Sequence, residues 1–458
     1  MIVMKFGGSS VANAERIRHV AQIIKAFADS RPIVVLSAMG DTTDHLLEAA
    51  DAALAGEIRI DAVRDLHIKT AQELNVPVTE IESLLAELTT LLTGISMLRE
   101  VSPRSRDYLV SFGERLSIRL MAGYLNSLPL RAEFKDAWDV GFASDSNFMN
   151  ADLLPETWEN IRKSLSPYAN GKKGDGMPIP IVTGFIAKDP NGTITTLGRG
   201  GSDLTATILG AALGAQEVQT WKDVDGILTT DPRVVKEAKT VPVATYDEVA
   251  ELAYFGAQVL HPRSMQPCLQ TGTPVRVKNS YNIEAPGTII VTSHPSTPSP
   301  VRAITSKKDV TVIDIVSTRM LGQHGFLAKV FEAFAKHGIS VDVVATSEVS
   351  ISLTVDSKKV QFSNLRHELE KYASIDIRKG KAIVTIICDV KRTSQILAAS
   401  FEVLARGGIN IQMLSQGASK VNISMICDSD EVDTVVRLLH GRYFGPNGED
   451  LITEGVHT

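Results

Sequence analysis

The sequence predicts an α/β protein with one large domain of alternating strands and helices, followed by two small α+β units. Residues 1–292 alternate short apolar runs with segments of helical periodicity, which is typical of a mostly parallel sheet covered by helices on both faces. The segment SHPSTPSPV (293–301) then interrupts the alternation, and its prolines and serines mark a domain boundary. After this boundary, one pattern of residues occurs twice.

Predicted helices and strands alternate in the first half of the chain. Ile17, Ala21 and Ile24 recur at helical spacing before a β-branched apolar strand over residues 32–36. Two more helices are predicted over residues 81–98 and 106–125, and two more strands over residues 180–186 and 217–221. Thr245 and Glu248 have the spacing of a capping box, which predicts the start of a helix.

The repeat pairs residues 325–356 with residues 395–428. The matching positions include Leu327 with Leu397, Phe331 with Phe401 and Gly338 with Gly408. Each copy predicts the order strand, helix, glycine, strand, turn, strand, and the glycine is placed to end the helix. A small repeated unit favours binding of a ligand or partner over catalysis. The predicted boundaries are residues 1–292, a linker over 293–307 that can lend a strand to the second small unit, and units over 308–382 and 383–458.

Composition excludes several classes of protein. The chain has 458 residues, a net charge of −6 and no long basic cluster, so we expect no nucleic-acid partner. We expect no membrane partner, because no apolar run is long enough to span a bilayer and the first residues lack a signal-peptide core. Cys268, Cys388 and Cys427 lie far apart, which favours a reducing compartment, and no histidine or cysteine spacing predicts a metal site.

Two glycine-rich motifs precede predicted helices and suit anion binding. In KFGGSSV (5–11) the glycine pair lets backbone N–H groups approach an anion, although the spacing is not that of a P-loop. In TLGRGGSDLTA (196–206) Arg199 offers a rigid fork for a carboxylate or phosphate, Ser202 is the predicted N-cap, and Asp203 falls in the first helical turn.

A plain glycine-rich turn is the alternative for KFGGSSV, and three further motifs are also weak when taken singly. SAMGDTTD (37–44) and WKDVDG (221–226) with TTDPR (229–233) follow predicted strands, where open α/β sheets bind ligands, but ordinary turns have the same composition. Glu114 in SFGER (111–115) is on a helix, and a solvated Glu–Arg pair is the alternative there.

Together and in this order, KFGGSSV, SFGE, GRGGSDLTA, DVDG with TTDPR, and GAQVLHP resemble the motifs of the aspartate kinases, of the amino-acid kinase superfamily. The repeat resembles their paired ACT domains. Gln258, WKDVDG and STRMLGQ are most similar to the monofunctional, lysine-sensitive plant type. The resemblance implies an amino-acid-kinase-type αβα sandwich followed by two ferredoxin-like ACT domains. It also implies transfer of the ATP γ-phosphoryl group to the β-carboxylate of L-aspartate, the first step toward lysine, threonine and methionine.

The resemblance also implies residue roles. Lys5 and Asp203 are the implied catalytic residues, and Mg²⁺ is expected to be carried by ATP rather than by a dedicated protein site. The implied aspartate-binding residues are Ser37, Thr43, Glu114 and Arg199. The implied nucleotide-binding residues are Gly7, Gly8, Ser9, Lys222, Asp223, Asp231, Arg233 and Gln258. Three positions depart from the commonest family pattern: Ser9 replaces Thr, Gln258 replaces Lys, and Ile227 stands where some members have Tyr.

An allosteric site is implied in the first repeat, at a homodimer interface of ACT domains. The expected inhibitor is L-lysine, with S-adenosylmethionine and threonine as alternatives. The implied effector residues are Met320, Gln323, Gly325, Phe326, Leu327, Ser340, Val341, Asp342, Thr346, Ser347 and Glu348. Because Gln412 matches Asp342 in the second repeat, only the first repeat is expected to bind lysine.

Assembly, compartment and activity leave alternatives at this point. The oligomer is a dimer or a tetramer, and the repeat could serve dimerisation alone. The compartment is the bacterial cytoplasm, or the plastid stroma if a transit peptide has been removed. The alternative functions are a kinase of another amino-acid carboxylate such as glutamate, and a non-catalytic amino-acid sensor with this fold.

Overall fold

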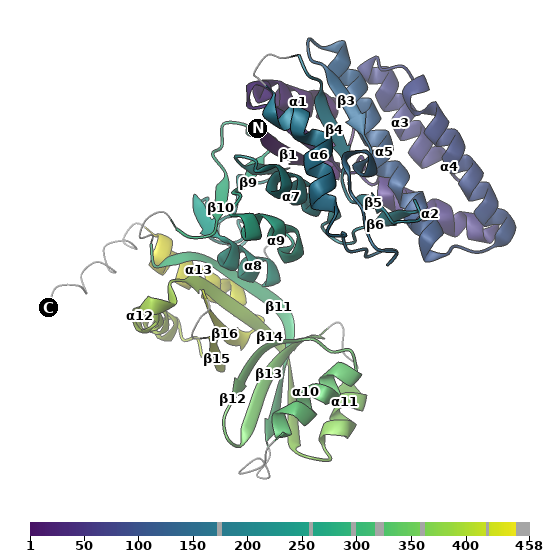
Figure 1. Cartoon of the computed structure of the whole chain (residues 1–458). Coiled ribbons are helices and arrows are strands. Elements are labelled where there is room, and N and C mark those ends of the chain that lie inside the picture. The colour runs from purple at the N-terminus through teal and green to yellow at the C-terminus, as the bar shows by residue number, and fades with distance from the viewer. Residues whose placement is uncertain are drawn as a thin grey trace. The chain divides into compact units, whose positions relative to one another are not determined.

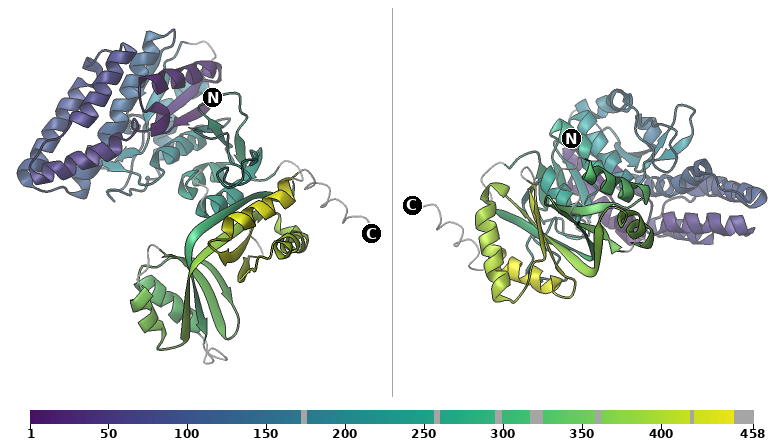
Figure 2. Two further views of the ribbon diagram at one scale, coloured as in Figure 1. Left: turned by 180° about the vertical axis from the view of Figure 1, so that it is seen from behind. Right: turned by 90° about the horizontal axis from the view of Figure 1, so that it is seen from below.

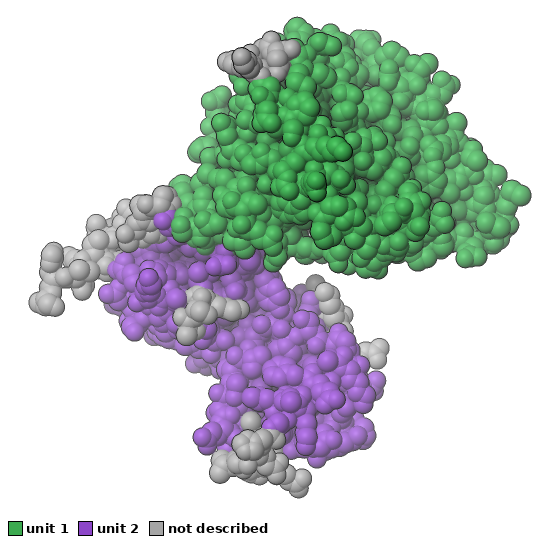
Figure 3. Space-filling view, in the orientation of Figure 1, with its two compact units in different colours: residues 1–227, 242–246, 259–293 green, residues 228–241, 247–258, 294–458 purple. Residues whose placement is uncertain are grey.

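The computed structural model divides the chain into two compact units (Figures 1 and 3). It describes residues 1–171, 176–255, 260–294, 299–316, 325–357, 362–417 and 421–445. Unit 1 comprises residues 1–227, 242–246 and 259–293, and unit 2 comprises residues 228–241, 247–258 and 294–458. The two units therefore alternate along the chain between residues 227 and 294.

An eight-stranded sheet in the order β3-β4-β2-β1-β7-β9-β10-β8 forms the centre of unit 1. Its strands are β1 (Ile2–Phe6), β2 (Pro32–Leu36), β3 (Ala132–Lys135), β4 (Ile179–Thr183), β7 (Val218–Lys222), β8 (Val243–Thr245), β9 (Val275–Asn279) and β10 (Thr288–Val291). Neighbouring strands are parallel except β9 and β10. A separate pair consists of β5 (Ile186–Lys188) and β6 (Ile194–Thr196).

The strand predictions for this sheet hold with one correction. The predicted strand over 32–36 is confirmed as β2, and the one over 217–221 is confirmed within a residue as β7. The strand predicted over 180–186 ends at Thr183 instead. Phe185 has a φ of 71°, so the extended backbone is interrupted before β5 begins.

Helices cover both faces of the sheet (Figure 2). Met4 and Phe6 share one core with α1 (Ala14–Ala26), α2 (Thr42–Ala55), α3 (Asp61–Leu74), α4 (Thr79–Leu98) and α5 (Pro103–Ser127). On the other face α7 (Gly201–Leu213) packs against β1 and β2, and it is flanked by α6 (Thr157–Asn170) and α9 (Pro262–Thr271). Because successive side chains of a strand point to opposite faces, Lys5 of β1 points toward the α7 layer. The predicted αβα sandwich is confirmed.

The helix α4 is long and apolar enough to cross a membrane by length and composition alone. Its residues Ile81, Leu84, Leu88 and Leu92, however, lie in the core that it shares with α2 and α5. About a third of its apolar window (33%) is buried, so α4 packs one face on the core, and a single helix of this kind is weak evidence for a membrane span.

A six-stranded antiparallel sheet in the order β12-β13-β11-β14-β16-β15 forms unit 2. Its strands are β11 (Val301–Val316), β12 (Val341–Thr346), β13 (Ser350–Asp356), β14 (Ser374–Cys388), β15 (Met413–Gln416) and β16 (Asn422–Asp428). Its helices are α10 (Phe326–Lys336), α11 (Phe362–Leu369), α12 (Thr393–Arg406) and α13 (Val432–Phe444). Helix α8 (Tyr246–Tyr254) also belongs to this unit from residue 247 onward.

The long strands β11 and β14 each serve both copies of the repeat. Residues 310–316 of β11 pair with β13, whereas residues 301–307 pair with the last residues of β14. Each copy thereby completes a unit of four strands and two helices with its own core. Gly338 and Gly408 follow α10 and α12 with φ values of 63° and 70°, which confirms that each glycine adopts the left-handed conformation that ends a helix.

Candidate active site

A cavity of about 540 Å³ opens at the carboxyl ends of β1 and β2 in unit 1. Parallel strands end at the same edge of a sheet, so motifs that are distant in sequence meet there. All six residues predicted for catalysis or aspartate binding line this cavity: Lys5, Ser37, Thr43, Glu114, Arg199 and Asp203.

An ion pair joins the two implied catalytic residues. Lys5 Nζ lies 2.8 Å from Asp203 Oδ1, and the two side chains are only 10% and 11% exposed. Lys5 comes from β1, while Asp203 stands in the first turn of α7. A cation and the N-terminus of a helix therefore face the same cavity, and both favour the binding of anionic groups.

Two glycines bring the walls of the cavity together at Ala38. A Cβ at Gly8 would lie 2.8 Å from the Ala38 carbonyl oxygen, and a Cβ at Gly113 would lie 2.6 Å from the Ala38 Cβ. Only glycine allows the loop after β1 and the helix α5 to approach this residue so closely. The approach of α5 lets the Ala38 N–H donate to Glu114 Oε1 over 3.2 Å.

Glu114 is a buried carboxyl group with an unused acceptor. It is 4% exposed, and its Oε2 has no hydrogen-bond partner among the residues that the structure describes. Burial raises the pKa of Glu114 to about 8, although the Ala38 N–H and the charge of Lys5 oppose this shift. A buried acceptor without a partner costs free energy, so the geometry suits a ligand that brings a positively charged donor.

Arg199 faces the cavity from a glycine-rich turn. Gly198 and Gly200 have φ values of 70° and 77°, so the backbone reverses sharply on both sides of Arg199. Arg199 is exposed and makes no hydrogen bond or ion pair with another described residue. The prediction of Ser202 as N-cap is wrong: α7 begins at Gly201, and Gly200 occupies the cap because its left-handed backbone turns the chain into the helix.

Sequence reasoning missed groups that complete the cavity. Phe185 lines it, and its positive φ left no sign in the sequence. The Ala38 N–H is a backbone group, so no motif points to it. Asp107, buried on α5, accepts hydrogen bonds of 2.9 Å from the backbone N–H groups of Met149 and Thr196, and burial raises the pKa of Asp107. It therefore fixes the strand that leads to Arg199 relative to the helix that carries Glu114.

Residues of the predicted nucleotide set lie in both units. Gly7, Gly8 and Ser9 follow β1 in the loop that begins a short 3₁₀ helix. Lys222 ends β7, the neighbour of β1, and burial lowers its pKa, while the charge of Asp203 opposes this shift and that of Lys5 reinforces it. Asp223 is exposed next to it.

The remaining nucleotide residues lie elsewhere in the chain. Asp231 and Arg233 belong to unit 2, where Arg233 Nη2 lies 2.7 Å from Asp231 Oδ2. This hydrogen-bonded guanidinium lowers the pKa of Asp231. Gln258 lies outside the described residues. Among the residues that the structure describes, no group of three or more His, Cys, Asp or Glu could hold a metal ion.

The predicted effector residues belong to unit 2. Gly325 is the N-cap of α10, Phe326 begins this helix and is buried, and Leu327 is 42% exposed. The edge strand β12 contains Val341, Asp342 and Thr346. Ser340 precedes this strand, and Ser347 and Glu348 lie in the turn that follows it. The predicted residues Met320 and Gln323 lie outside the described residues.

Comparisons with known proteins agree with this arrangement. Residues 1–279 match the amino acid kinase family, and residues 313–362 and 384–443 match an ACT domain. Aspartokinase 1, chloroplastic, of Arabidopsis thaliana is 51% identical over 458 aligned residues, which cover 96% of this chain and 80% of the relative. The chain belongs to the aspartokinase family.

Solved aspartokinase structures share the fold. The structure of Escherichia coli aspartokinase III in complex with lysine and aspartate has a TM-score of 0.78 at 33% identity, covering 97% of this chain and 99% of that one. Its complex with aspartate and ADP has a TM-score of 0.75 at 34% identity and covers 97% and 100% of the two chains. The chain is therefore an aspartate kinase with ACT domains, which decides against glutamate as the acceptor and against a silent sensor.

Proposed function

We propose that this aspartokinase transfers the γ-phosphoryl group of ATP to the β-carboxylate of L-aspartate at the cavity beside β1 and β2, and that L-lysine inhibits it through unit 2. The observation that carries the proposal is the meeting of the Lys5–Asp203 pair, the unpartnered Oε2 of Glu114 and the unpaired Arg199 in one cavity. These groups complement the charges of an amino acid whose second carboxylate meets a phosphate.

Glu114 and Arg199 would orient the substrate. The α-ammonium group of aspartate would donate to Glu114 Oε2, and the α-carboxylate would pair with the fork of Arg199. Ser37 and Thr43, which line the same cavity, would supply hydroxyl groups to the substrate. Holding both ends of the amino acid directs the β-carboxylate toward the phosphoryl group, so catalysis would come largely from positioning.

Lys5 and Asp203 would act at the phosphoryl group. The attacking carboxylate is already ionised, so the reaction needs no strong general base. Lys5 would neutralise charge on the phosphoryl oxygens, and the backbone N–H groups of Gly7 and Gly8 would donate to them. Asp203 supplies a single carboxylate at the cavity wall. Such a group suits a divalent cation that is held mainly by phosphate oxygens. Mg²⁺ bound there would offset the negative charge of the phosphates.

The nucleotide would lie beyond the phosphoryl site. Ser9 follows β1 and Lys222 ends the neighbouring strand β7, which supports a nucleotide wall on that side. Asp223, Asp231, Arg233 and Gln258 complete the proposed nucleotide set.

The proposal also covers regulation by lysine and assembly into a homo-oligomer. The E. coli relative was crystallised with lysine and aspartate in a T-state and with aspartate and ADP in an R-state, which supports lysine as the inhibitor here. The effector site would use the first repeat at a homodimer of ACT domains, within a dimer or tetramer. The same proposal includes domain boundaries at residues 292, 307 and 382. It also includes a place in threonine and methionine synthesis and a location in the bacterial cytoplasm or the plastid.

The test is ADP release from Mg-ATP with L-aspartate or L-glutamate, each with and without millimolar L-lysine. We expect turnover with aspartate alone, suppressed by lysine. Turnover with aspartate that ignores lysine would overturn the regulatory part, and turnover with glutamate instead of aspartate would overturn the substrate.

A further inference from the structure

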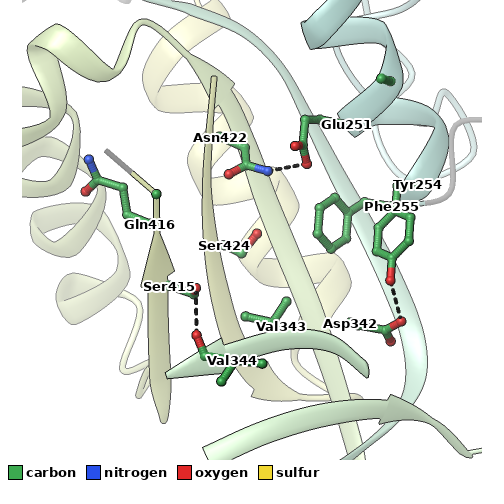
Figure 4. A pocket seen from close by; sticks show the side chains of 12 residues that line it. Glu251, Tyr254, Phe255, Asp342, Val343, Val344, Ser415, Gln416, Asn422 and Ser424 are labelled. Carbon is green, nitrogen blue, oxygen red and sulfur yellow. Dashed lines mark hydrogen bonds between the residues drawn. The ribbon is translucent and has the colours of Figure 1, made fainter. Parts of the chain in front are cut away.

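A second cavity, of about 610 Å³, lies within unit 2 (Figure 4). Helix α8 forms one wall and the strands β12, β15 and β16 form the others. Two acidic side chains, Glu251 and Asp342, line it together with the ring of Tyr254. Polar side chains of Gln416, Asn422 and Ser424 line the remainder.

The carboxylate of Asp342 is engaged on both oxygens by side chains of the chain itself. Lys307 Nζ lies 2.7 Å from Oδ2, and the Tyr254 hydroxyl donates to Oδ1 over 3.0 Å. The Asp342 side chain is only 5% exposed and that of Lys307 is 23% exposed. Figure 4 shows the Tyr254 hydroxyl pointing at Asp342 along this contact.

The surroundings of the Lys307 ammonium are those of an ammonium-binding site. Its Nζ lies 5.8 Å from the centre of the Tyr254 ring, so a carboxylate and an aromatic face both contribute. Proteins recognise free ammonium compounds with this combination of groups. Here a side chain of the same chain occupies the position.

Backbone geometry turns Asp342 toward this cavity. The pairing of β12 with β13 shifts register between Val341 and Val344. These two valines pack against the core of α10, whereas Val343 packs with Phe255 on the other side of the sheet. Asp342 therefore meets Lys307 of β11 and Tyr254 of α8 rather than the core of the repeat.

We propose that Lys307 is an internal competitor for the effector, because its ammonium occupies the place at Asp342 that a free primary ammonium group takes when it binds. The inference rests on the proposed function, which assigns Asp342 to an amino-acid effector. Binding then requires exchange of one ammonium for another at Asp342, so Lys307 sets the effector concentration at which regulation begins. Glu251, on the same cavity wall, is a second carboxylate and accepts a hydrogen bond from Asn422.

The second repeat lacks this arrangement. Gln412 occupies the position that matches Asp342, and its Nε2 donates to Asp428 over 3.0 Å. An amide attracts an ammonium far less than a carboxylate does. Lys381 pairs with Asp428 instead of the residue that matches Asp342, so we assign the competition to the first repeat.

The first experiment is calorimetric titration of L-lysine into the full-length wild type and the variants Lys307→Met and Lys308→Met. Lys308 is the matched control, because it is the next residue of β11 and pairs with Asp433, with Nζ 2.8 Å from Oδ1 and side chains 50% and 37% exposed. We expect Lys307→Met to bind L-lysine roughly tenfold more tightly and Lys308→Met to stay within about twofold of wild type. L-norleucine, which lacks the side-chain ammonium, should gain less than L-lysine from Lys307→Met.

A second measurement uses the wild type and does not depend on the folding of a variant. Acetylation of lysine side chains by acetic anhydride is followed by mass spectrometry with and without saturating L-lysine. Because free L-lysine also consumes the anhydride, the acetylation rate of Lys307 is divided by that of Lys308, and we expect saturation to raise this ratio severalfold. If the wild type binds L-lysine while this ratio stays constant, the competition is overturned and the proposed function stands.

Three outcomes of the titration also decide whether Lys307 competes with the effector. Unchanged or weaker binding of L-lysine by a folded Lys307→Met variant would overturn the competition. Absence of L-lysine binding in the wild type and in Lys307→Met alike would overturn both the proposed effector and this inference. Binding by Lys307→Met alone would support the inference in its strongest form.

Discussion

At the residue scale, the active-site cavity depends on charges held where water is scarce. Lys5 and Asp203 form a nearly buried pair, and Glu114 is buried with a free oxygen. Electrostatic interactions strengthen as the surrounding dielectric falls, so each of these groups acts more strongly on a bound ligand than it would in water. Burial also disfavours ionisation of the Glu114 carboxyl group until a positively charged ligand binds beside it.

Glu114→Gln should impair aspartate binding while leaving the fold intact. The amide keeps the size of the side chain but loses the charge that would pair with the substrate ammonium group. We expect kcat/KM for aspartate to fall roughly 10- to 100-fold, the size of one hydrogen bond to a charged group. The KM for ATP, measured on the same preparations, should change by less than about twofold. A variant with unchanged aspartate kinetics would remove Glu114 from the site.

The same residue predicts how stability depends on pH. The pKa of Glu114 is about 8 in the folded chain against 4.5 for an ordinary glutamate, so between these values the folded state holds a proton that the unfolded state has lost. This contribution stabilises the fold at low pH and disappears as the pH rises toward 8. Urea unfolding should show Glu114→Gln gaining roughly 1–3 kcal/mol relative to wild type between about pH 5 and about pH 8.5. A difference that does not vary with pH would contradict the raised pKa.

At the scale of elements, the site depends on how closely α5 approaches the loop after β2. The Cβ that Gly113 lacks would collide with Ala38, and the hydrogen bond from the Ala38 N–H to Glu114 exists only because this space is open. The glycine of the SFGE motif is thus a packing requirement, whereas we propose a chemical role for the glutamate.

Gly113→Ala should therefore lower both stability and aspartate affinity. Overpacking of this contact should cost roughly 1–3 kcal/mol in the free energy of unfolding, and displacement of Glu114 should raise the KM for aspartate. Gly94→Ala is the control, because Gly94 lies within α4 and a Cβ there would meet nothing within 4 Å. It should stabilise the chain by roughly 1 kcal/mol through helix propensity and leave KM unchanged. Equal effects of the two substitutions would show that the contact with Ala38 does not matter.

Some contacts between elements could be predicted from the sequence, and others could not. The meeting of Lys5 with Asp203 was predictable, because each motif follows or precedes an element of a parallel sheet and such ends converge. The partners of Asp342 were not, because they depend on a register shift in β12 and on a helix outside the repeat. The N-cap of α7 was misassigned because Gly200 has a left-handed backbone, which residue type alone does not reveal.

At the scale of the whole molecule, each unit has its own core, and each contains one of the two cavities described above. The proposed catalytic and effector residues thus belong to different units, so we expect lysine and aspartate to bind to different groups. Any influence of lysine on the reaction must be a coupling free energy between separate sites, and such coupling is reciprocal.

Reciprocity gives a prediction for the full chain. If L-lysine raises the Kd for L-aspartate in the presence of ADP by some factor, then aspartate must raise the Kd for lysine, also measured in the presence of ADP, by the same factor, typically about 5- to 150-fold. Calorimetric titration of each ligand with and without the other measures both factors. Arg199→Met should abolish the effect of aspartate on lysine binding but preserve lysine binding itself, because Arg199 lies in unit 1. Inhibition without any change in either Kd would mean that lysine acts on the rate of the bound complex, since reciprocity constrains equilibrium binding and not turnover.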